Sequence, residues 1–159
     1  LGFRLYADEE FDLYRRTVRD LVHARVLAFP SPPTKRAKEQ LLEALDRQGC
    51  ENARLLARSW KDLGGKVFLE ECLAASVEYL GSPERTKNKR ASRRFANTIR
   101  TWGRSLKSKQ RRKAWAESLL GAFVGHELLV IGRKTSVDPA FEVLCGFAER
   151  PVPTVATYS

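Results

Sequence analysis

The chain has 159 residues, of which 43% are hydrophobic and 30% are charged. This composition supplies enough apolar side chains for the core of one domain, with or without an appendage, and excludes disorder over the whole length. The three cysteines are an odd number without CxxC spacing. They disfavour a disulfide framework or a zinc site and predict buried thiols in a reducing compartment. No apolar run reaches the length that a membrane-spanning helix needs.

The positive charge of the chain is concentrated in one segment. The formal net charge is +10, and residues 85–113 hold 13 Lys and Arg residues and no acidic residue. The rest of the chain has 16 basic and 19 acidic residues. A concentrated positive field attracts polyanions, so this segment predicts something about binding partners and nothing about the fold.

The chain contains no methionine, so Leu1 is not the product of a start codon. We expect it to follow a removed leader, such as an organelle presequence, or the trimmed end of a longer chain.

The N-terminal half is predicted to form a bundle of three to four helices over residues 1–81. Apolar residues at three-and-four spacing predict helices at 8–29, 34–48, 51–63 and 66–80. Thr34 is a candidate N-cap of the second helix and Gly49 its stop. Breaks are expected at Pro30–Pro33, at Gly64-Gly65 and at Gly81-Ser82-Pro83.

The C-terminal half is predicted to be a basic helical extension over residues 84–150, followed by an extended tail over residues 151–159. Helices are expected at 92–106 and from Ser108 to about Gly125. Periodicity alone leaves open whether residues 128–131 form a short strand or a buried turn. The fold class predicted for the whole chain is therefore mainly α.

The sequence offers little catalytic chemistry. The only two histidines, His23 and His126, are not in an HExxH or HxH arrangement, and no GxSxG, Walker or GxGxxG sequence occurs. We therefore expect a protein that is not an enzyme, with no metal site and no cofactor of its own.

The basic segment is the first candidate binding site. Arginine binds phosphate oxygens bidentately, and exposed Phe95 and Trp102 rings would stack on unpaired bases. The alternative is that Phe95, Ile99, Trp102 and Leu106 are core residues, which their helical spacing favours. We expect RNA of a ribonucleoprotein as the partner, with an acidic protein or anionic lipid as alternatives. The candidate nucleic-acid-binding residues are Lys87, Lys89, Arg90, Arg93, Arg94, Arg100, Arg104, Lys107, Lys109, Arg111, Arg112 and Lys113.

The second candidate site lies in the first predicted helix, in the sequence Leu13-Tyr14-Arg15 with Arg16 and Arg19 one turn on. This sequence resembles the signature of the LYR-motif family of small mitochondrial three-helix proteins. The resemblance covers residues 11–73. Two features depart from the family pattern: Leu45 stands where the family has a phenylalanine, and prolines interrupt the first connection.

The resemblance implies a partner, the mitochondrial acyl carrier protein. Leu13, Tyr14, Arg15, Arg16 and Arg19 would then bind the acidic carrier. The acylated phosphopantetheine arm of the carrier would enter the space between the helices. The residues expected to line that space are Tyr14, Val18, Leu21, Leu41, Leu45, Leu56 and Trp60.

Taken together, these features predict a non-catalytic subunit or assembly factor of a large mitochondrial complex in the matrix, with the mitochondrial ribosome favoured. The first helix would dock the carrier protein, and the basic segment would bind RNA or another polyanion. The alternative is a basic helical nucleic-acid-binding protein unrelated to the LYR family, located in the cytoplasm.

Overall fold

A computed structural model describes residues 8–28 and 33–155. Within these ranges the chain forms seven α-helices, a 3-10 helix and a two-stranded β-hairpin. The predicted mainly α class is confirmed. The chain divides into two compact units, residues 1–70 and 71–159.

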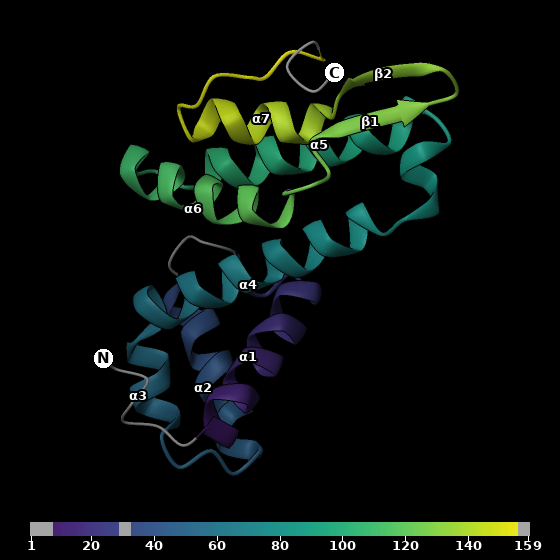
Figure 1. Ribbon diagram of the computed structural model, residues 1–159. Helices are drawn as coiled ribbons and strands as arrows, with labels where there is room; N and C mark the ends of the chain where they lie inside the picture. Colours follow the sequence, from purple (N-terminus) through teal and green to yellow (C-terminus); the bar gives the residue numbers. More distant parts are fainter. Residues whose placement is uncertain (1–7, 29–32, 156–159) are drawn as a thin grey trace. The chain divides into compact units, whose positions relative to one another are not determined.

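The first unit contains α1 (Asp8–His23), α2 (Lys35–Arg47), α3 (Ala53–Arg58) and the beginning of α4 (Trp60–Leu80). Figure 1 shows α1 and α2 side by side. Each helix buries one apolar face in a shared core. The side chains of this core include Tyr14, Val18, Leu41, Leu45, Leu56, Trp60 and Val67.

The first helix is shorter than the sequence predicted. It ends at His23, because Arg25 adopts a left-handed conformation (φ 59°) and the Val26 N–H donates to the Leu21 carbonyl. The predicted cap of α2 is confirmed: the Thr34 hydroxyl accepts a hydrogen bond from the Ala37 N–H. Residues 29–32, which include most of the predicted proline break, lie outside the described residues.

The predicted break at Gly64-Gly65 is wrong. The interruption lies at Ser59, and α4 continues through both glycines. Gly64 packs against the Trp60 ring, so closely that a Cβ there would lie 3.1 Å from two ring atoms. Glycine in a helix interior costs only about 1 kcal/mol. The burial of Leu63 and Val67 on the same helix outweighs that cost.

The second unit contains the rest of α4, a 3-10 helix η2 (Pro83–Thr86), α5 (Lys89–Ser105), α6 (Lys109–Ala122), β1 (Leu128–Ile131), β2 (Lys134–Val137) and α7 (Pro139–Phe147). Figure 1 shows α5, α6 and α7 side by side, with the hairpin connecting α6 to α7. The two strands pair antiparallel, from Leu128 opposite Val137 to Ile131 opposite Lys134. Residues 128–131 are therefore a strand.

Two boundaries in this half differ from those predicted. Helix α5 begins at Lys89, not at Ser92, because the Asn88 side chain caps it by accepting from the Arg90 N–H. The boundary between the compact units lies after Glu70, inside α4, whereas the sequence placed the end of the first bundle at Gly81. The second half of α4 belongs to the second unit because its side chains, Tyr79 among them, pack there.

Helices α5 and α7 pack closely at Gly103. A Cβ at this position would overlap the Phe147 ring, so only glycine fits. The overlap should cost about 1–3 kcal/mol, and the better helix propensity of alanine should offset about 1 kcal/mol of it. We therefore predict that Gly103→Ala lowers the free energy of unfolding of the second unit by up to about 2 kcal/mol. Urea unfolding followed by circular dichroism measures the change. Gly146→Ala on α7 is the matched control, because its Cβ meets nothing within 4 Å, and it should stabilise or leave stability unchanged.

Candidate nucleic-acid interface

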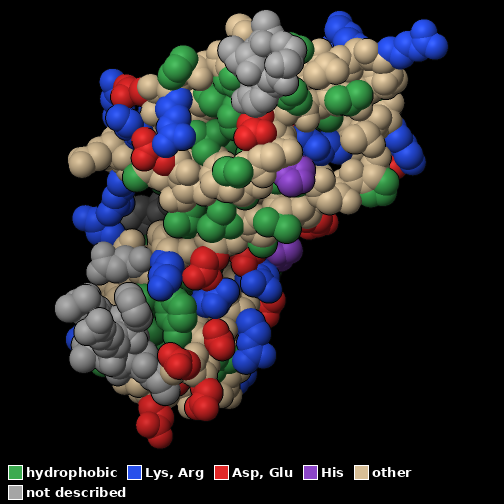
Figure 2. Space-filling view, in the orientation of Figure 1, with side chains coloured by type: hydrophobic (Ala, Val, Ile, Leu, Met, Phe, Trp, Pro, Cys, Tyr) green, Lys and Arg blue, Asp and Glu red, His purple; other side chains and the backbone are tan. Residues whose placement is uncertain are grey.

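The twelve basic residues predicted to bind nucleic acid lie on α5, on α6 and on the short segments that precede these helices. Lys89 and Arg112 are half-buried, and the other ten side chains are exposed. Figure 2 shows Lys and Arg side chains at both ends of the second unit, near the hairpin at the upper right and near the start of α6 at the left. The apolar stripe of α5 faces the core, and the Lys and Arg side chains of this helix lie on its opposite, solvent-facing side.

Some of these basic residues already have partners. Lys87 pairs with Glu84 at 3.2 Å, and Glu149 pairs with Lys109 at 2.9 Å and with Lys113 at 3.7 Å. No carboxylate of a described side chain lies within ion-pair distance of the half-buried Lys89 or of the other exposed cations on α5, on α6 and between the two helices. These are Lys89, Arg90, Arg93, Arg94, Arg100, Arg104, Lys107 and Arg111.

Arg112 has a structural role in addition to its charge. Its Nε donates to the Gly103 carbonyl at 3.0 Å, and its Nη2 donates to the Leu106 carbonyl at 2.8 Å. These carbonyls belong to the end of α5, where the regular i+4 partners of an α-helix are absent; the Gly103 carbonyl also accepts from the Leu106 N–H at 3.2 Å. Arg112 therefore closes the turn between α5 and α6, which leaves less of its guanidinium for a ligand.

The aromatic rings of α5 pack inside the unit. Phe95 stacks on Tyr79 at 4.4 Å between ring centroids and meets Trp102 edge-on at 5.8 Å. Ile99, on the same stripe, is fully buried. The packing therefore supports the prediction that this stripe belongs to the core, and not the alternative that its rings are exposed for base stacking. Phe95 and Trp102 are at most half-exposed, so they do not form an open platform for bases.

The structure adds two basic residues that the sequence analysis missed, Arg133 and Lys134 at the hairpin tip. The charge of Lys134 lowers the pKa of Lys89 on α5, and so does the charge of Arg93. The hairpin tip therefore carries a positive charge close to the start of α5. The sequence carried a signal for them, the Gly132-Arg133-Lys134 turn. Only the folded hairpin brings that turn beside a helix distant in sequence.

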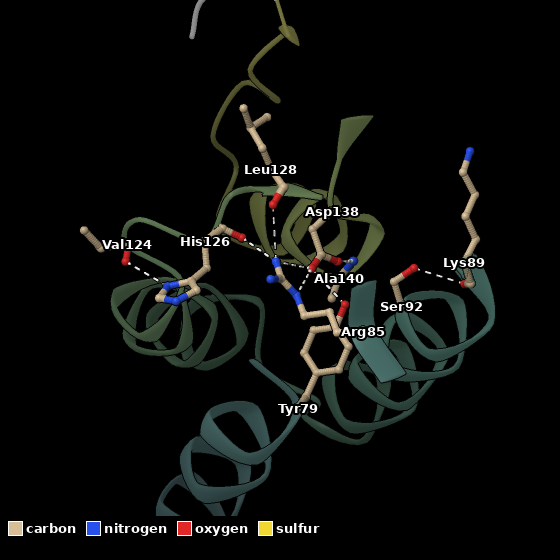
Figure 3. Close-up of polar contacts among 9 residues, drawn as sticks. All are labelled: Tyr79, Arg85, Lys89, Ser92, Val124, His126, Leu128, Asp138 and Ala140. Carbon is tan, nitrogen blue, oxygen red and sulfur yellow. Dashed lines mark hydrogen bonds and ion pairs between the residues drawn. The ribbon is translucent and has the colours of Figure 1, made fainter. Parts of the chain in front are cut away.

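A buried ion pair fixes the hairpin (Figure 3). Arg85 donates through Nε and Nη2 to Asp138 Oδ2, at 3.1 and 2.9 Å, and the Tyr79 hydroxyl donates to the same oxygen at 2.8 Å. Asp138 Oδ1 accepts from the Ala140 N–H and so caps α7. The Asp138 side chain is fully buried and that of Arg85 is 8% exposed. Arg85 is therefore not a surface cation, although it belongs to the basic segment.

The same pair ties both ends of the hairpin to η2. Arg85 Nη2 donates to the His126 carbonyl at 2.8 Å, just before β1, and Asp138 directly follows β2. Burial and the neighbouring Asp138 carboxylate raise the pKa of Tyr79. Tyr79 thus stays protonated and keeps donating its hydrogen bond at physiological pH. The position of the hairpin tip relative to α5 follows from this network.

The LYR-like residues lie on α1 in the first unit. Tyr14 is fully buried and Leu13 half-buried, whereas Arg16 and Arg19 are exposed. Arg15 pairs with Glu70 of α4 at 2.6 Å and with Asp12 at 3.4 Å. The structure thus places all five residues on one helix, but it engages Arg15 inside the unit.

The residues expected to line an acyl channel form a closed core. Tyr14, Val18, Leu41, Leu45 and Leu56 have no exposed surface, and Trp60 is 3% exposed. Leu21 is half-buried and packs against them. An acyl chain would enter only if these side chains moved apart, which interiors packed at this density resist.

The cysteines and the acidic residues of the described ranges do not form a metal cluster. In residues 8–28 and 33–155 no three His, Cys, Asp or Glu side chains are placed to hold a metal ion. Over the same ranges no helix has the length and apolar character to cross a membrane. All three cysteines are buried and free, and burial raises the pKa of the Cys72 thiol to about 12. Cys72 therefore stays protonated at neutral pH.

Comparison with models of known protein families, with curated proteins and with solved structures found no match to this chain. The resemblance to the LYR-motif family consequently rests on the residues of the motif alone. Any function has to be inferred from the surfaces just described.

Glu149 forms ion pairs with two of the cations on α6, Lys109 and Lys113. The hydrogen bond from Lys109 and the charge of that residue lower the pKa of Glu149. We predict that Glu149→Gln increases RNA affinity by about 2- to 10-fold at low salt, because it frees Lys109 and Lys113 for phosphates. Fluorescence anisotropy with labelled RNA measures the change. Glu78→Gln, an exposed acid of the same unit with no ion-pair partner among the described residues, gives the same change in net charge and should have a smaller effect.

Proposed function

We propose that the second unit binds RNA through the phosphate backbone. The observation that carries the proposal is the surface of α5 and α6, where eight cations lack carboxylate partners among the described residues. Cations without carboxylate partners repel one another. Binding of phosphates relieves this repulsion and releases the ions bound to the nucleic acid, so it lowers the free energy.

A nucleic acid such as RNA is favoured over an acidic protein or anionic lipid for two reasons. The cations extend along a 17-residue helix and continue onto α6, which suits a linear array of phosphates better than a compact acidic patch. Anionic lipid is recognised by cations flanked by exposed apolar anchors. The exposed large apolar residues of this unit, such as Val124 and Val152, are valines outside α5.

The test is a salt titration of RNA binding by the intact protein. Affinity for a labelled RNA should fall linearly on a log–log plot, with a slope of about −0.7 to −0.9 per phosphate contact. An acidic polypeptide such as polyglutamate serves as the competitor. If RNA bound no more tightly than polyglutamate and anionic vesicles, the proposal would fail.

We further propose that this RNA-binding protein is a non-catalytic subunit or assembly factor of a large mitochondrial complex, with the mitochondrial ribosome as the favoured host. A surface that binds phosphates without reading bases suits a component that is held in place by structural RNA. Purification from the native source followed by mass spectrometry would identify the complex. Recovery of the protein free of ribosomal components would contradict the assignment of the host.

Docking of an acyl carrier protein through the first helix is the second candidate function. The observation that favours it is the exposure of Arg16 and Arg19 beside the buried Tyr14 on α1. The closed core argues against entry of the acyl chain, so docking by charge alone is the simpler form of this proposal.

Reversal of Arg15, Arg16 and Arg19 to glutamate is expected to abolish carrier binding while RNA binding changes by less than about threefold. Copurification of acyl carrier protein, followed by intact mass spectrometry, measures the first effect. Reversal of Lys35, Arg36 and Arg58, also exposed in the first unit, is the charge-matched control. Equal loss of carrier in both triple variants would refute a specific site on α1.

A further inference from the structure

A concavity of about 660 Å³ lies along the first turns of α5. It is lined by Asn88, Lys89, Arg90, Arg93, Arg94 and Asn97. A second hollow of about 210 Å³ shares Lys89 and Arg93 and reaches Ser136 and Val137 of β2. We call these two neighbouring hollows, which share Lys89 and Arg93, the groove between α5 and the hairpin.

The groove concentrates positive charge. Lys89 and Arg93 line both hollows. Lys134 lies on the same face of β2 as Ser136, which lines the smaller hollow, and its charge lowers the pKa of Lys89. Figure 3 shows the Lys89 side chain extended away from the buried network of Arg85 and Asp138. One carboxylate, Glu142, lines the smaller hollow, and it is within ion-pair distance of neither cation.

The hairpin is held in place before any ligand binds. Arg85 contacts the chain just before β1, and Asp138 just after β2, so both ends of the hairpin are fixed to η2 and α7. Because the hairpin is already fixed, little conformational entropy is lost when this cluster of cations binds an anion. The repulsion between Lys134 and Lys89 is relieved when an anion lies between them.

The groove offers contacts to backbone groups and not to base faces. Every described Phe, Tyr and Trp side chain is buried or half-buried, so none of these rings is open for a base to stack on. Asn97 lines the larger hollow, and its Oδ1 accepts a hydrogen bond from Arg100, so its amide NH₂ group is the part that can donate to a ligand. Amide and guanidinium donors suit phosphate oxygens and 2′-hydroxyl groups.

From these observations we infer that the groove between α5 and the hairpin holds the phosphodiester backbone of double-stranded RNA, with Arg133 and Lys134 as binding residues. The inference rests on the proposed function and extends it to a substrate form and to two residues outside the basic segment. Double-stranded RNA presents phosphates and 2′-hydroxyls on a rigid surface and keeps its bases stacked. A single strand would offer bases for which this surface has no platform.

The test compares a labelled 20-base-pair RNA duplex with one of its strands, chosen to be unstructured, by fluorescence anisotropy. The wild-type protein should bind the duplex about tenfold more tightly. Arg133→Gln/Lys134→Gln should weaken duplex binding about tenfold and reduce the magnitude of the salt slope by about 1.8. Lys35→Gln/Arg36→Gln, in the first unit, gives the same change in net charge and should leave both quantities nearly unchanged. An unchanged unfolding midpoint verifies that each variant is folded.

The outcomes separate this inference from the function on which it rests. RNA binding with equal effects of the two double variants would overturn the hairpin site and leave the proposed function standing. Single-stranded binding as tight as duplex binding would overturn the preference for duplex. Absence of binding to either RNA would overturn both the inference and the proposed function.

Discussion

Replacement of Asp138 by asparagine is expected to lower the free energy of unfolding of the second unit by about 3–5 kcal/mol. The substitution keeps the shape of the side chain but leaves the Arg85 guanidinium buried without its counterion. The amide also cannot accept all of the hydrogen bonds that Tyr79, Arg85 and the Ala140 N–H now donate. Removal of one partner of a buried pair is costly because it strands the other charge.

Amide hydrogen exchange in β1 and α7, compared with α2, measures this loss and assigns it to the second unit. The control is Glu84→Gln, which removes the same charge from the exposed pair with Lys87, where both side chains are 62% exposed. That change should cost less than about 1 kcal/mol. Addition of Arg85→Met to Asp138→Asn should recover part of the stability, because the stranded charge is then gone. A loss in Asp138→Asn no larger than that of Glu84→Gln would show that the pair does not hold the hairpin.

Neutralisation of Arg93, Arg94, Arg100 and Arg104 to glutamine is expected to weaken RNA binding about 100- to 1,000-fold at low salt and to reduce the magnitude of the salt slope by about 3–4. All four side chains are exposed on α5 and lack carboxylate partners among the described residues. Glutamine is a good helix former, so the fold should tolerate the change. Anisotropy titrations at several salt concentrations measure both quantities.

The matched control neutralises Lys35, Arg36, Lys38 and Arg58, four exposed cations of the first unit. If net charge alone drove binding, the two quadruple variants would lose equal affinity. A loss confined to the α5 variant would place the interface on the second unit. Retention of affinity and slope in the α5 variant would refute the proposed interface.

Local sequence was sufficient to predict most of the helices. The three-and-four spacing on α5 places Ile99 in the core, and the hydroxyl of Thr34 marks the start of α2. Both signals act within one or two helical turns, so they are readable without knowledge of the fold. The concentration of charge in residues 85–113 is likewise a property of the sequence alone.

Propensity failed where long-range packing opposed it. Gly64 and Gly65 predicted a break, yet α4 continues through them, because burial of the side chains around them outweighs a cost of about 1 kcal/mol per glycine. Arg85 belongs to a segment predicted to be a charged surface, yet it is buried against Asp138. Neither outcome follows from the neighbouring residues in the chain.

The sequence by itself determined that this protein is mainly helical and that its positive charge lies on α5 and α6 and in the segments before them. Only the tertiary structure decided which of those charges stay available, because Glu149 and the carbonyls at the end of α5 engage some of them. It also brought the charge of Lys134 close enough to Lys89 to lower the pKa of Lys89. The physical reason is that helix formation depends on neighbours within a few residues, whereas charges far apart in the chain meet only after the hairpin has packed.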